Sequence, residues 1–431
     1  MSSKSTITAR AEAAKAASLR LAATKTETKN AALTAVAKAL DERRGDILAA
    51  NEQDLAAAEK VNLAAPLLKR LKFDGAKLAD VCAGIHSLIG LDDPVGRTLS
   101  AVELDTGLEL YRVSCPIGLI GVVFESRPDA LVQISTLCLK SGDAVLLKGG
   151  SEAAQTNRIL AEIIAEASKE AGLPAGWIQL LETRQDVAEM LALDEHIDLI
   201  IPRGSNEFVR YIMNNTNVPV LGHADGICHV YVDADAELDT AVDITVDSKC
   251  QYVAVCNAAE TLLVDASIAG EFLPEVKIAL KAENVRLLGC ERTRAIIEVE
   301  PASEVDWSTE YLDYTLSIKV VDGLDAAIDH INRYGSGHTD AIVTGDRDKA
   351  EKFMAQVDSA DVLWNCSTRF SDGYRYGLGA EVGISTNKIH ARGPVGLEGL
   401  VIYKWKLYGK GQLVADYAGP EAKKFTHKKL R

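Results

Sequence analysis

Ile117-Gly-Leu-Ile-Gly-Val-Val-Phe124 is a nearly continuous apolar run, and this composition predicts a short strand that is buried on both faces. A helix-like apolar stripe follows at residues 160–167 and is ended by Gly172. Because strand and helix patterns alternate, this part of the chain predicts a parallel sheet with helices on both faces. The other strands are expected at four apolar runs, residues 144–147, 177–181, 199–201 and 230–233.

The chain on either side of this sheet has its own patterns. Up to about residue 60 we expect helices, since Leu33, Val36 and Leu40 fall on one face at helical spacing. Gly45 and Asn51 mark the expected breaks between these helices. A second series of strand and helix patterns begins at residue 261 and predicts a second α/β domain.

Two segments differ from the rest because they predict strands outside these sheets. Residues 98–113 alternate apolar and polar side chains around Asp105-Thr-Gly107, which is a hairpin signal. Residues 400–408 also predict a strand. They are either ordinary edge strands or arms that pair with another subunit, since exposed strand edges must be covered.

Composition excludes several classes of protein. The chain has 431 residues and a net charge of −15, which argues against a nucleic-acid partner because phosphate binding needs a basic surface. Its eight cysteines form no CxxC pair, and its histidines form no HxxxH pair, so we expect free thiols, a reducing compartment and no metal site. The polar N-terminus does not resemble a signal peptide, and the longest apolar run, residues 115–124, is too short to span a bilayer. We therefore expect a cytoplasmic protein with no membrane partner.

Cys256 stands in Val253-Ala-Val-Cys-Asn-Ala258, between a helix pattern and a strand pattern. A loop is expected there, and a loop could present the thiol to a ligand. Such a cysteine is either a small buried core residue or a nucleophile, which needs an electropositive setting to form thiolate.

Two turns could hold a dinucleotide, although the sequence contains no GxGxxG fingerprint. In the first turn a strand ends at Lys148 and runs through Gly149 and Gly150 towards a helix. In the second, Gly204 and Ser205 precede a helix whose free N–H groups would favour phosphate. Each turn could equally be structural.

Cationic side chains in three polar loops are candidates for binding an anionic substrate. Arg127 follows the strand at 117–124, Ser367 and Arg369 share one loop, and Arg392 lies in His390-Ala-Arg-Gly-Pro394. A guanidinium group suits both phosphate and carboxylate, but each arginine could instead pair with a surface acid.

Several of these segments together resemble the γ-glutamyl phosphate reductases, a family within the aldehyde dehydrogenase superfamily, over nearly the whole chain. The segments that carry the resemblance are Gly121–Pro128, Cys138–Asp143, Ile200–Gly204, Gly222–Asp233, Val255–Ala258, Glu260–Leu263, Ser367–Phe370 and His390–Pro394.

The resemblance implies a fold as well as an activity. It implies an aldehyde-dehydrogenase-like α/β fold with a Rossmann-like parallel-sheet cofactor domain, an α/β catalytic domain and a strand-arm oligomerisation region. The expected boundaries are 1–97 and 115–253 for the cofactor domain, 254–395 for the catalytic domain, 98–114 and 396–414 for the arms, and 415–431 for a C-terminal tail.

The resemblance also implies a role for each matching residue. Cys256 is similar to the family's thiol nucleophile, and Ser126 stands where related enzymes place an oxyanion-hole asparagine. The implied cofactor is NADPH/NADP, and the residues that match its site are Lys148, Gly149 and Gly150 near the adenosine ribose, Gly204 and Ser205 near the pyrophosphate, and Glu310 near the nicotinamide ribose. The candidates for substrate binding are Arg127, Ser367, Arg369 and Arg392.

One departure bears on the reaction. Hydrolytic aldehyde dehydrogenases carry a glutamate that activates water, whereas this chain has Leu221-Gly-His-Ala-Asp225 in the corresponding region. The resemblance therefore implies reduction of L-glutamyl 5-phosphate in proline biosynthesis, with a separate glutamate 5-kinase as supplier and a homodimer or higher homo-oligomer as the assembly. The alternatives are a hydrolytic aldehyde dehydrogenase on the same fold and a catalytically silent scaffold.

Overall fold

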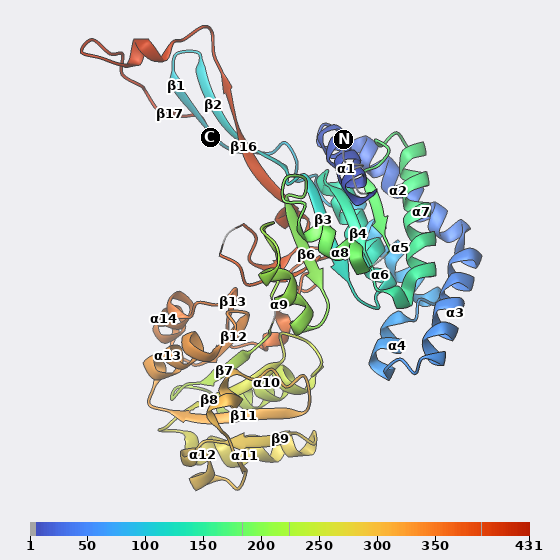
Figure 1. Ribbon diagram of the computed structural model, residues 1–431. Helices are drawn as coiled ribbons and strands as arrows, with labels where there is room; N and C mark the ends of the chain where they lie inside the picture. Colours follow the sequence, from blue (N-terminus) through green and yellow to red (C-terminus); the bar gives the residue numbers. More distant parts are fainter. Residues whose placement is uncertain (1–5, 183, 224, 389) are drawn as a thin grey trace.

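Two bodies, each built on a parallel sheet, and a long sheet-like arm make up the chain (Figure 1). The computed structural model describes residues 6–182, 184–223, 225–388 and 390–431. The first five residues of the expected cofactor domain therefore lie outside the described residues. The α/β class predicted from the alternating patterns is confirmed.

The first body contains a four-stranded parallel sheet in the order β5-β4-β3-β6. The expected apolar runs form its strands, which are β3 (Leu119–Phe124), β4 (Ala144–Lys148), β5 (Ile178–Leu181) and β6 (Leu199–Arg203). Its helices are α1 (Thr6–Leu21), α2 (Thr26–Glu42), α3 (Arg44–Lys60), α4 (Ala65–Leu71), α5 (Gly75–Gly90), α6 (Pro128–Ser141), η1 (Ser151–Ala153), α7 (Ala154–Glu170), α8 (Arg184–Leu191) and α9 (Asn206–Asn214). Throughout the described part of the chain, every helix is too short or too polar to cross a bilayer.

The break expected at Asn51 is wrong, because this residue lies inside α3. Its buried amide donates to the Leu71 carbonyl at 3.0 Å and accepts from the Phe73 N–H at 2.8 Å. Tertiary hydrogen bonds thus satisfy the polar atoms that usually disfavour asparagine in a helix. The break expected near Gly45 is confirmed, since α2 ends at Glu42 and α3 begins at Arg44.

The second body contains a seven-stranded parallel sheet in the order β10-β9-β11-β8-β7-β12-β13. Its strands are β7 (Cys228–Val232), β8 (Ala259–Asp265), β9 (Arg286–Gly289), β10 (Glu300–Pro301), β11 (Thr315–Val321), β12 (Thr339–Val343) and β13 (Asp361–Trp364). Its helices are α10 (Leu238–Cys250), α11 (Ala269–Ala282), α12 (Glu291–Ile296), η2 (Glu304–Ser308), α13 (Leu324–Tyr334), α14 (Arg347–Gln356) and η3 (Thr368–Phe370).

The chain passes from the first body to the second before β7, and not at the domain boundary expected near residue 253. β7 pairs with β8 and β12, so β7 and the following α10 belong to the second body. A short ladder of β14 (Gly383–Ser385) and β15 (Gly393–Val395) then leads back to the first body, where η4 (Leu397–Leu400) packs against α6.

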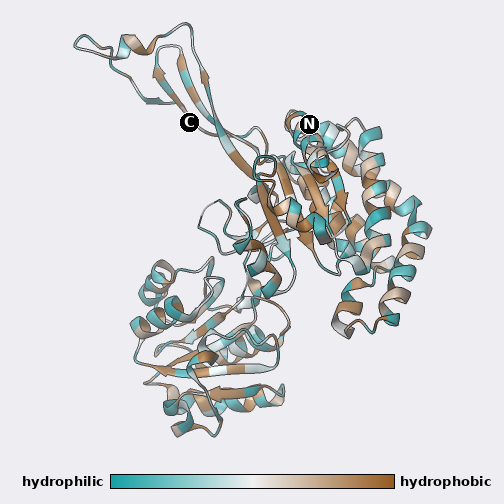
Figure 2. Ribbon diagram, viewed as in Figure 1, coloured by the Kyte–Doolittle hydropathy of each residue, from teal (hydrophilic) through white to brown (hydrophobic). Residues whose placement is uncertain are grey.

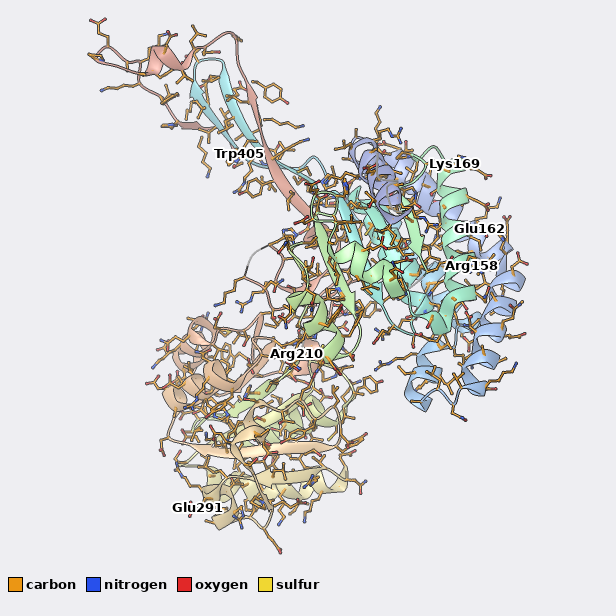
Figure 3. The ribbon with its side chains drawn as sticks, viewed as in Figure 1. Arg158, Glu162, Lys169, Arg210, Glu291 and Trp405 are labelled. Carbon is orange, nitrogen blue, oxygen red and sulfur yellow. The ribbon has the colours of Figure 1, made fainter. Side chains whose placement is uncertain are left out.

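The arm is an antiparallel sheet in the order β16-β2-β1-β17, and it projects from the first body (Figures 1 and 2). The expected hairpin forms β1 (Thr98–Asp105) and β2 (Leu108–Pro116), and the expected strand near residue 400 forms β16 (Val401–Tyr408). Trp405 lies on β16, away from both bodies (Figure 3). The expected tail contributes η5 (Val414–Tyr417) and β17 (Lys428–Lys429), which pairs with β1.

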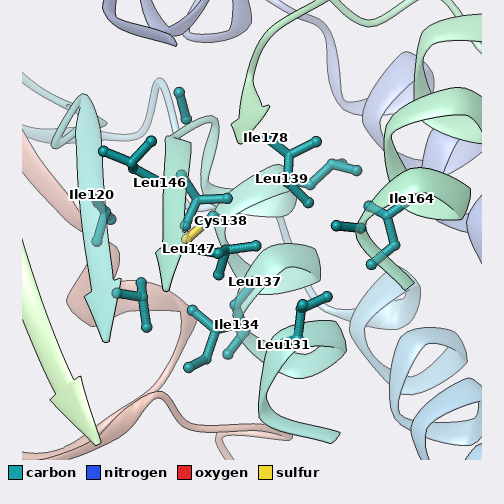
Figure 4. Close-up of a cluster of buried hydrophobic side chains, with 14 of the residues drawn as sticks. Ile120, Leu131, Ile134, Leu137, Cys138, Leu139, Leu146, Leu147, Ile164 and Ile178 are labelled. Carbon is teal, nitrogen blue, oxygen red and sulfur yellow. The ribbon is translucent and has the colours of Figure 1, made fainter. Parts of the chain in front are cut away.

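The core of the first body fixes the strand ends that matter for ligand binding. Side chains of β3, β4, β5, α6 and α7 interlock around Cys138 and Leu147, which are fully buried (Figure 4). Burial of each such side chain contributes about 1.5–3 kcal/mol. The carboxyl ends of β3, β4 and β6 are thereby held side by side, and ligands of open α/β sheets bind at such ends.

Candidate active site

The Cys256 thiol lies in the loop that joins α10 to β8, where it is partly exposed to a cavity between the two bodies. The first body contributes Arg127 and Arg203 to this cavity, from the carboxyl ends of β3 and β6. The second body contributes Glu310 from the segment before β11. The loop predicted at Cys256 is thus observed, and its sulfur faces groups of both charges.

Neighbouring elements hold this loop firmly. The Thr368 hydroxyl donates to the Asn257 carbonyl at 2.7 Å, and the Asn257 side chain donates to the Ser371 carbonyl at 2.7 Å. On either side of the loop, Lys249 of α10 and Glu260 of β8 form a fully buried ion pair at 2.6 Å. The backbone of Cys256 is therefore fixed through side chains that are themselves buried.

Gly226 lies directly behind the Cys256 backbone. A Cβ atom at this position would stand 1.9 Å from the Cys256 carbonyl oxygen and 2.5 Å from its Cα. Those distances are far below van der Waals contact, so a side chain here would displace the loop.

Two guanidinium groups lie close to the Cys256 sulfur. Burial lowers the pKa of Arg203, the neighbouring Arg127 lowers it further, and Glu381 and Cys256 act in the opposite direction. Burial likewise lowers the pKa of Arg369, and Cys256 again opposes that effect. Both arginines are thus near enough to stabilise negative charge on the sulfur.

Two histidines also lie beside the thiol. One ring nitrogen of His223, one of His338 and the Cys256 sulfur all lie within 4.8 Å of one another. The two rings meet edge to face with centroids 4.6 Å apart. Burial lowers the pKa of His223, which favours the uncharged form of its ring.

A second cavity adjoins the first, because Glu125 lines both. Its wall includes Lys148, Gly149 and Gly150 at the end of β4. A Cβ atom on Gly149 would lie 2.1 Å from the Asn157 amide nitrogen, and one on Gly150 would lie within 2.4 Å of the Glu152 carboxylate. A side chain at either glycine would therefore collide with the residues packed around this wall.

Ser126 belongs to this second cavity and not to the one at Cys256. Its N–H and its hydroxyl both donate to Glu152, at 2.7 and 2.6 Å. Its φ of 43° is in the left-handed region, which is sparsely populated by residues other than glycine. Such backbone strain clusters at ligand sites.

The turn at Gly204 and Ser205 begins α9, as expected. The Ser205 hydroxyl caps this helix by accepting from the Phe208 N–H. The Ser205 N–H donates to the Glu125 carboxylate at 3.1 Å. An anionic group therefore already sits at this helix N-terminus, in the position where the sequence predicted phosphate binding.

Predicted substrate residues divide into three groups. Arg127 lines the Cys256 cavity. Ser367 and Arg369 are buried behind the loop, where the Arg369 guanidinium donates to the Gln251 side chain at 2.9 Å. Arg392 lies elsewhere, because its guanidinium donates to the Asp358 carbonyl at 3.0 Å and lines a separate cavity near Pro394.

Comparison with known proteins identifies the family. The sequence profile of the aldehyde dehydrogenase family matches residues 1–287. A γ-glutamyl phosphate reductase of Pelotomaculum thermopropionicum is 67% identical over 416 residues, which are 96% of each chain. The chain belongs to the γ-glutamyl phosphate reductases of the aldehyde dehydrogenase family. A reductase of the same name from Acetivibrio thermocellus is 66% identical, again over 96% of each chain.

Solved structures agree with this family membership. The crystal structure of a γ-glutamyl phosphate reductase from Thermotoga maritima is 41% identical, covers 94% of this chain and 99% of its own, and gives a TM-score of 0.93. An acetylating aldehyde dehydrogenase from Geobacillus thermoglucosidasius is only 18% identical and shares the fold, with a TM-score of 0.65.

Four residues that lie next to Cys256 in the structure were not indicated by the sequence as part of its surroundings. They are Arg203, His223, Gly226 and His338. A signal existed for Arg203, which directly precedes Gly204 in the turn already singled out. His338 had none, since it lies 82 residues after Cys256 and in no distinctive motif.

Proposed function

We propose that this chain reduces L-glutamyl 5-phosphate to L-glutamate 5-semialdehyde and releases inorganic phosphate, in proline biosynthesis, with NADPH as the reductant. One observation carries the proposal: the Cys256 thiol opens into a cavity that shares Glu125 with the glycine-walled cavity at Lys148. Relatives named γ-glutamyl phosphate reductase, at 67% and 66% identity, support the choice of substrate.

Cys256 is the proposed nucleophile. Its thiolate attacks the acyl carbon, the bond from that carbon to the phosphate oxygen breaks, and a thioester remains on the sulfur. Phosphate leaves with the electron pair and takes a proton from solvent. Backbone N–H groups near Cys256 stabilise the tetrahedral oxyanion, and such donors typically contribute about 3–4 kcal/mol each. Ser126 can join them only after its hydroxyl leaves Glu152.

The cavity at Lys148 fits a dinucleotide, since it opens at the carboxyl ends of parallel strands and its wall lacks side chains at Gly149 and Gly150. Lys148 and these glycines would hold the adenosine ribose, with the Lys148 ammonium suited to the extra phosphate of NADP. When bound, NADPH supplies the hydride that reduces the thioester carbon. The carbon–sulfur bond to Cys256 then breaks, which releases the aldehyde and restores the thiolate.

Two further contacts would position the cofactor near the thiol. The turn at Gly204 and Ser205 would hold the pyrophosphate, which requires Glu125 to release the Ser205 N–H. Glu310 would hold the nicotinamide ribose, since it lines the Cys256 cavity and now accepts from the Asn206 amide.

Two arginines in the cavity are the proposed anion-binding groups. Arg127 and Arg203 face the space next to the thiol, where a guanidinium fork can hold phosphate or the substrate carboxylate. Arg369 and Ser367 act from behind the loop by holding its position. Arg392 has no part in the proposal, because its guanidinium is bound by Asp358 and lines a different cavity from Cys256.

The surroundings of Asp225 favour reduction over hydrolysis. This carboxylate lies in the region where hydrolytic relatives carry a base, and it accepts from the Asn206 amide at 3.0 Å and from Arg210. Both oxygens of this carboxylate thus already accept a hydrogen bond, which competes with orienting a water molecule for attack. The thioester would therefore persist long enough to be reduced.

The substrate supply, the compartment and the assembly of the enzyme are part of the proposed function. A separate glutamate 5-kinase would supply the acyl phosphate, and both enzymes would work in the cytoplasm. We also propose at least a homodimer built through the arm, because β16 exposes Tyr403, Trp405 and Leu407 by more than half of their surface.

The reverse reaction tests the proposed function. Purified protein is incubated with glutamate 5-semialdehyde and NADP, with and without inorganic phosphate, and NADPH formation is followed by absorbance. A phosphorylating reductase forms NADPH only when phosphate is present. NADPH formation without phosphate would identify a hydrolytic dehydrogenase instead, and the absence of NADPH in both arms would leave only a silent scaffold.

A further inference from the structure

Cys256, His223 and His338 converge at the base of the candidate active site. One donor atom from each residue lies within 4.8 Å of the other two. Donors bound to one tetrahedral zinc ion lie roughly 3.5 Å apart, given Zn–S and Zn–N distances of about 2.3 and 2.0 Å. We propose that these three residues form a Zn²⁺ site, and that an ion bound there blocks the nucleophile reversibly.

The histidine on the cavity side is already oriented as a ligand. Its Nδ1 lies 2.8 Å from the carbonyl oxygen of Ile384, and a carbonyl can only accept, so Nδ1 carries the proton. Nε2 is therefore the nitrogen of His223 that is left to bind a metal ion. A backbone carbonyl that holds the second nitrogen is a recurrent support for histidine ligands of zinc.

The buried histidine has a nitrogen that hydrogen bonding leaves unused. His338 is fully buried, and its Nε2 has no hydrogen-bond partner among the described residues. Its Nδ1 lies 2.8 Å from the Thr339 hydroxyl, whose oxygen can accept a hydrogen bond from Nδ1–H. Burying a nitrogen without a partner is unfavourable, so a ligand that takes its lone pair is favoured.

The cavity gives an ion access to these three donors. Cys256 and His223 line it, and His338 lies behind them with its ring edge-on to His223. The cavity side supplies a fourth position for water, which matches the open coordination of three-ligand zinc sites. Arg203 opposes a cation here, while Glu310 in the same cavity and a thiolate ligand favour it.

The sequence predicted no metal site, because the donors stand in three distant segments and form none of the usual spacings. The blocking effect rests on the proposed function, since it assumes that the Cys256 sulfur must be free for acyl transfer. Binding of the ion does not rest on that assumption, so the two can be tested separately.

Metal binding to the reduced full-length protein tests the site directly. Zn²⁺ is titrated by equilibrium dialysis, and Co²⁺ is used as a spectroscopic probe because a cobalt–thiolate bond gives a charge-transfer band. We expect one Zn²⁺ per chain and a cobalt–thiolate band in the native protein. Cys256→Ser should remove the band, and His223→Gln and His338→Gln should each weaken Zn²⁺ binding by roughly 100-fold.

Matched controls are His86→Gln on the exposed face of α5 and Cys82→Ser on the same helix, which should bind Zn²⁺ as the native protein does. If His338→Gln does not fold, His223→Gln on the cavity wall carries the test. Unchanged Zn²⁺ affinity in the cysteine and His223 variants would overturn the site, as would the absence of binding in the native protein.

Turnover gives the second readout. Added Zn²⁺ should inhibit the native enzyme over the concentration range in which it binds, and a chelator should restore the rate. Full activity with Zn²⁺ bound would overturn the blocking effect. If the protein binds Zn²⁺ as expected but never turns over glutamate 5-semialdehyde, the proposed function fails while the metal site remains.

Discussion

Cys256 places a single sulfur near Arg203 and Arg369, in a cavity that adjoins the Lys148 cavity at Glu125. Replacing this sulfur with the hydroxyl of serine removes the nucleophile and leaves the loop geometry in place. We expect Cys256→Ser to lower kcat by a factor on the order of 10³ or more. Steady-state turnover measures this loss, and NADPH fluorescence checks that cofactor binding is retained.

Cys82→Ser is the matched control for this substitution, because Cys82 lies on α5 and its hydrogen-bond contact is the Ala37 carbonyl. It should turn over normally. Normal turnover in Cys256→Ser itself would remove the thioester from the mechanism.

Gly226 offers a test that leaves every reacting group in place. A Cβ atom there would meet the Cys256 carbonyl oxygen at 1.9 Å, so Gly226→Ala must push the nucleophile loop by about 1 Å or more. A displacement of that size can reduce turnover by about 10²-fold. We expect that loss in kcat, together with cofactor binding close to that of the native protein.

Gly270→Ala is the control for the added methyl group, since a Cβ atom at Gly270 has open space around it. It should turn over at the native rate. A native rate in Gly226→Ala would show that the loop tolerates displacement and that its tight backing is unimportant for catalysis.

Single residues could be predicted from the sequence only where a motif marked them. The loop at Cys256 and the turns at Lys148 and Gly204 follow from where apolar runs end, because strand ends determine where turns lie. His338 could not be predicted in this way, since tertiary packing brings it to the thiol from the turn that precedes β12. Nothing local in the sequence shows that Arg392 would bind Asp358 and line a different cavity from Cys256.

At the scale of elements, α13 contains a buried histidine that should make the second body sensitive to acid. His330 accepts from the Lys319 ammonium at 3.0 Å, and burial lowers its pKa to about 2. In the unfolded chain the pKa is about 6.5, so below that pH the unfolded state binds a proton that the folded state does not. Stability is therefore lost as pH falls from about 6.5, by at most about 1.4 kcal/mol per pH unit.

His330→Gln removes this titration and keeps a side-chain acceptor for Lys319. Between pH 6.5 and 5.0, the free energy of unfolding should fall by about 2 kcal/mol less in this variant than in the native protein. Urea denaturation at the two pH values measures the difference, and His86→Gln on the surface is the control. Equal pH dependence in the native protein and the His330 variant would contradict the prediction.

Strands and helices could be predicted where hydrophobic periodicity was strong. The extent of α3 and the sheet to which β7 belongs could not, because tertiary contacts determine both. The strands of the first sheet, the hairpin and β16 match their apolar runs. Asn51 was expected to end a helix, but hydrogen bonds to Leu71 and Phe73 keep it inside α3. The apolar run of β7 fits either sheet, and its pairing with β8 depends on contacts that no local pattern encodes.

At the scale of the whole molecule, the arm is the surface that should join two copies of the chain. Trp405 is 56% exposed on β16, next to Tyr403 at a ring-centroid distance of 6.0 Å. Buried tryptophans at interfaces contribute about 2–4 kcal/mol each, so Trp405→Glu should weaken the oligomer at least about 30-fold. Sedimentation equilibrium of the native protein and the variant measures this change.

Val305→Glu is the control, because Val305 is also an exposed apolar residue (74%) but lies on η2 in the second body. It should leave the assembly unchanged. A native protein that sediments as a monomer at micromolar concentrations would show that β16 is an ordinary edge strand, which is the alternative that its sequence also allowed.

The pairing of β17 with β1 has a practical consequence for handling the protein. Leu430 and Arg431 donate their N–H groups to the Ala101 carbonyl, at 2.9 and 3.3 Å, directly after the two residues of β17. Deleting residues 428–431 would remove these bonds and leave the outer edge of β1 unpaired. Because an unpaired strand edge invites edge-to-edge aggregation, residues 428–431 should be kept in any preparation that is concentrated for crystallisation.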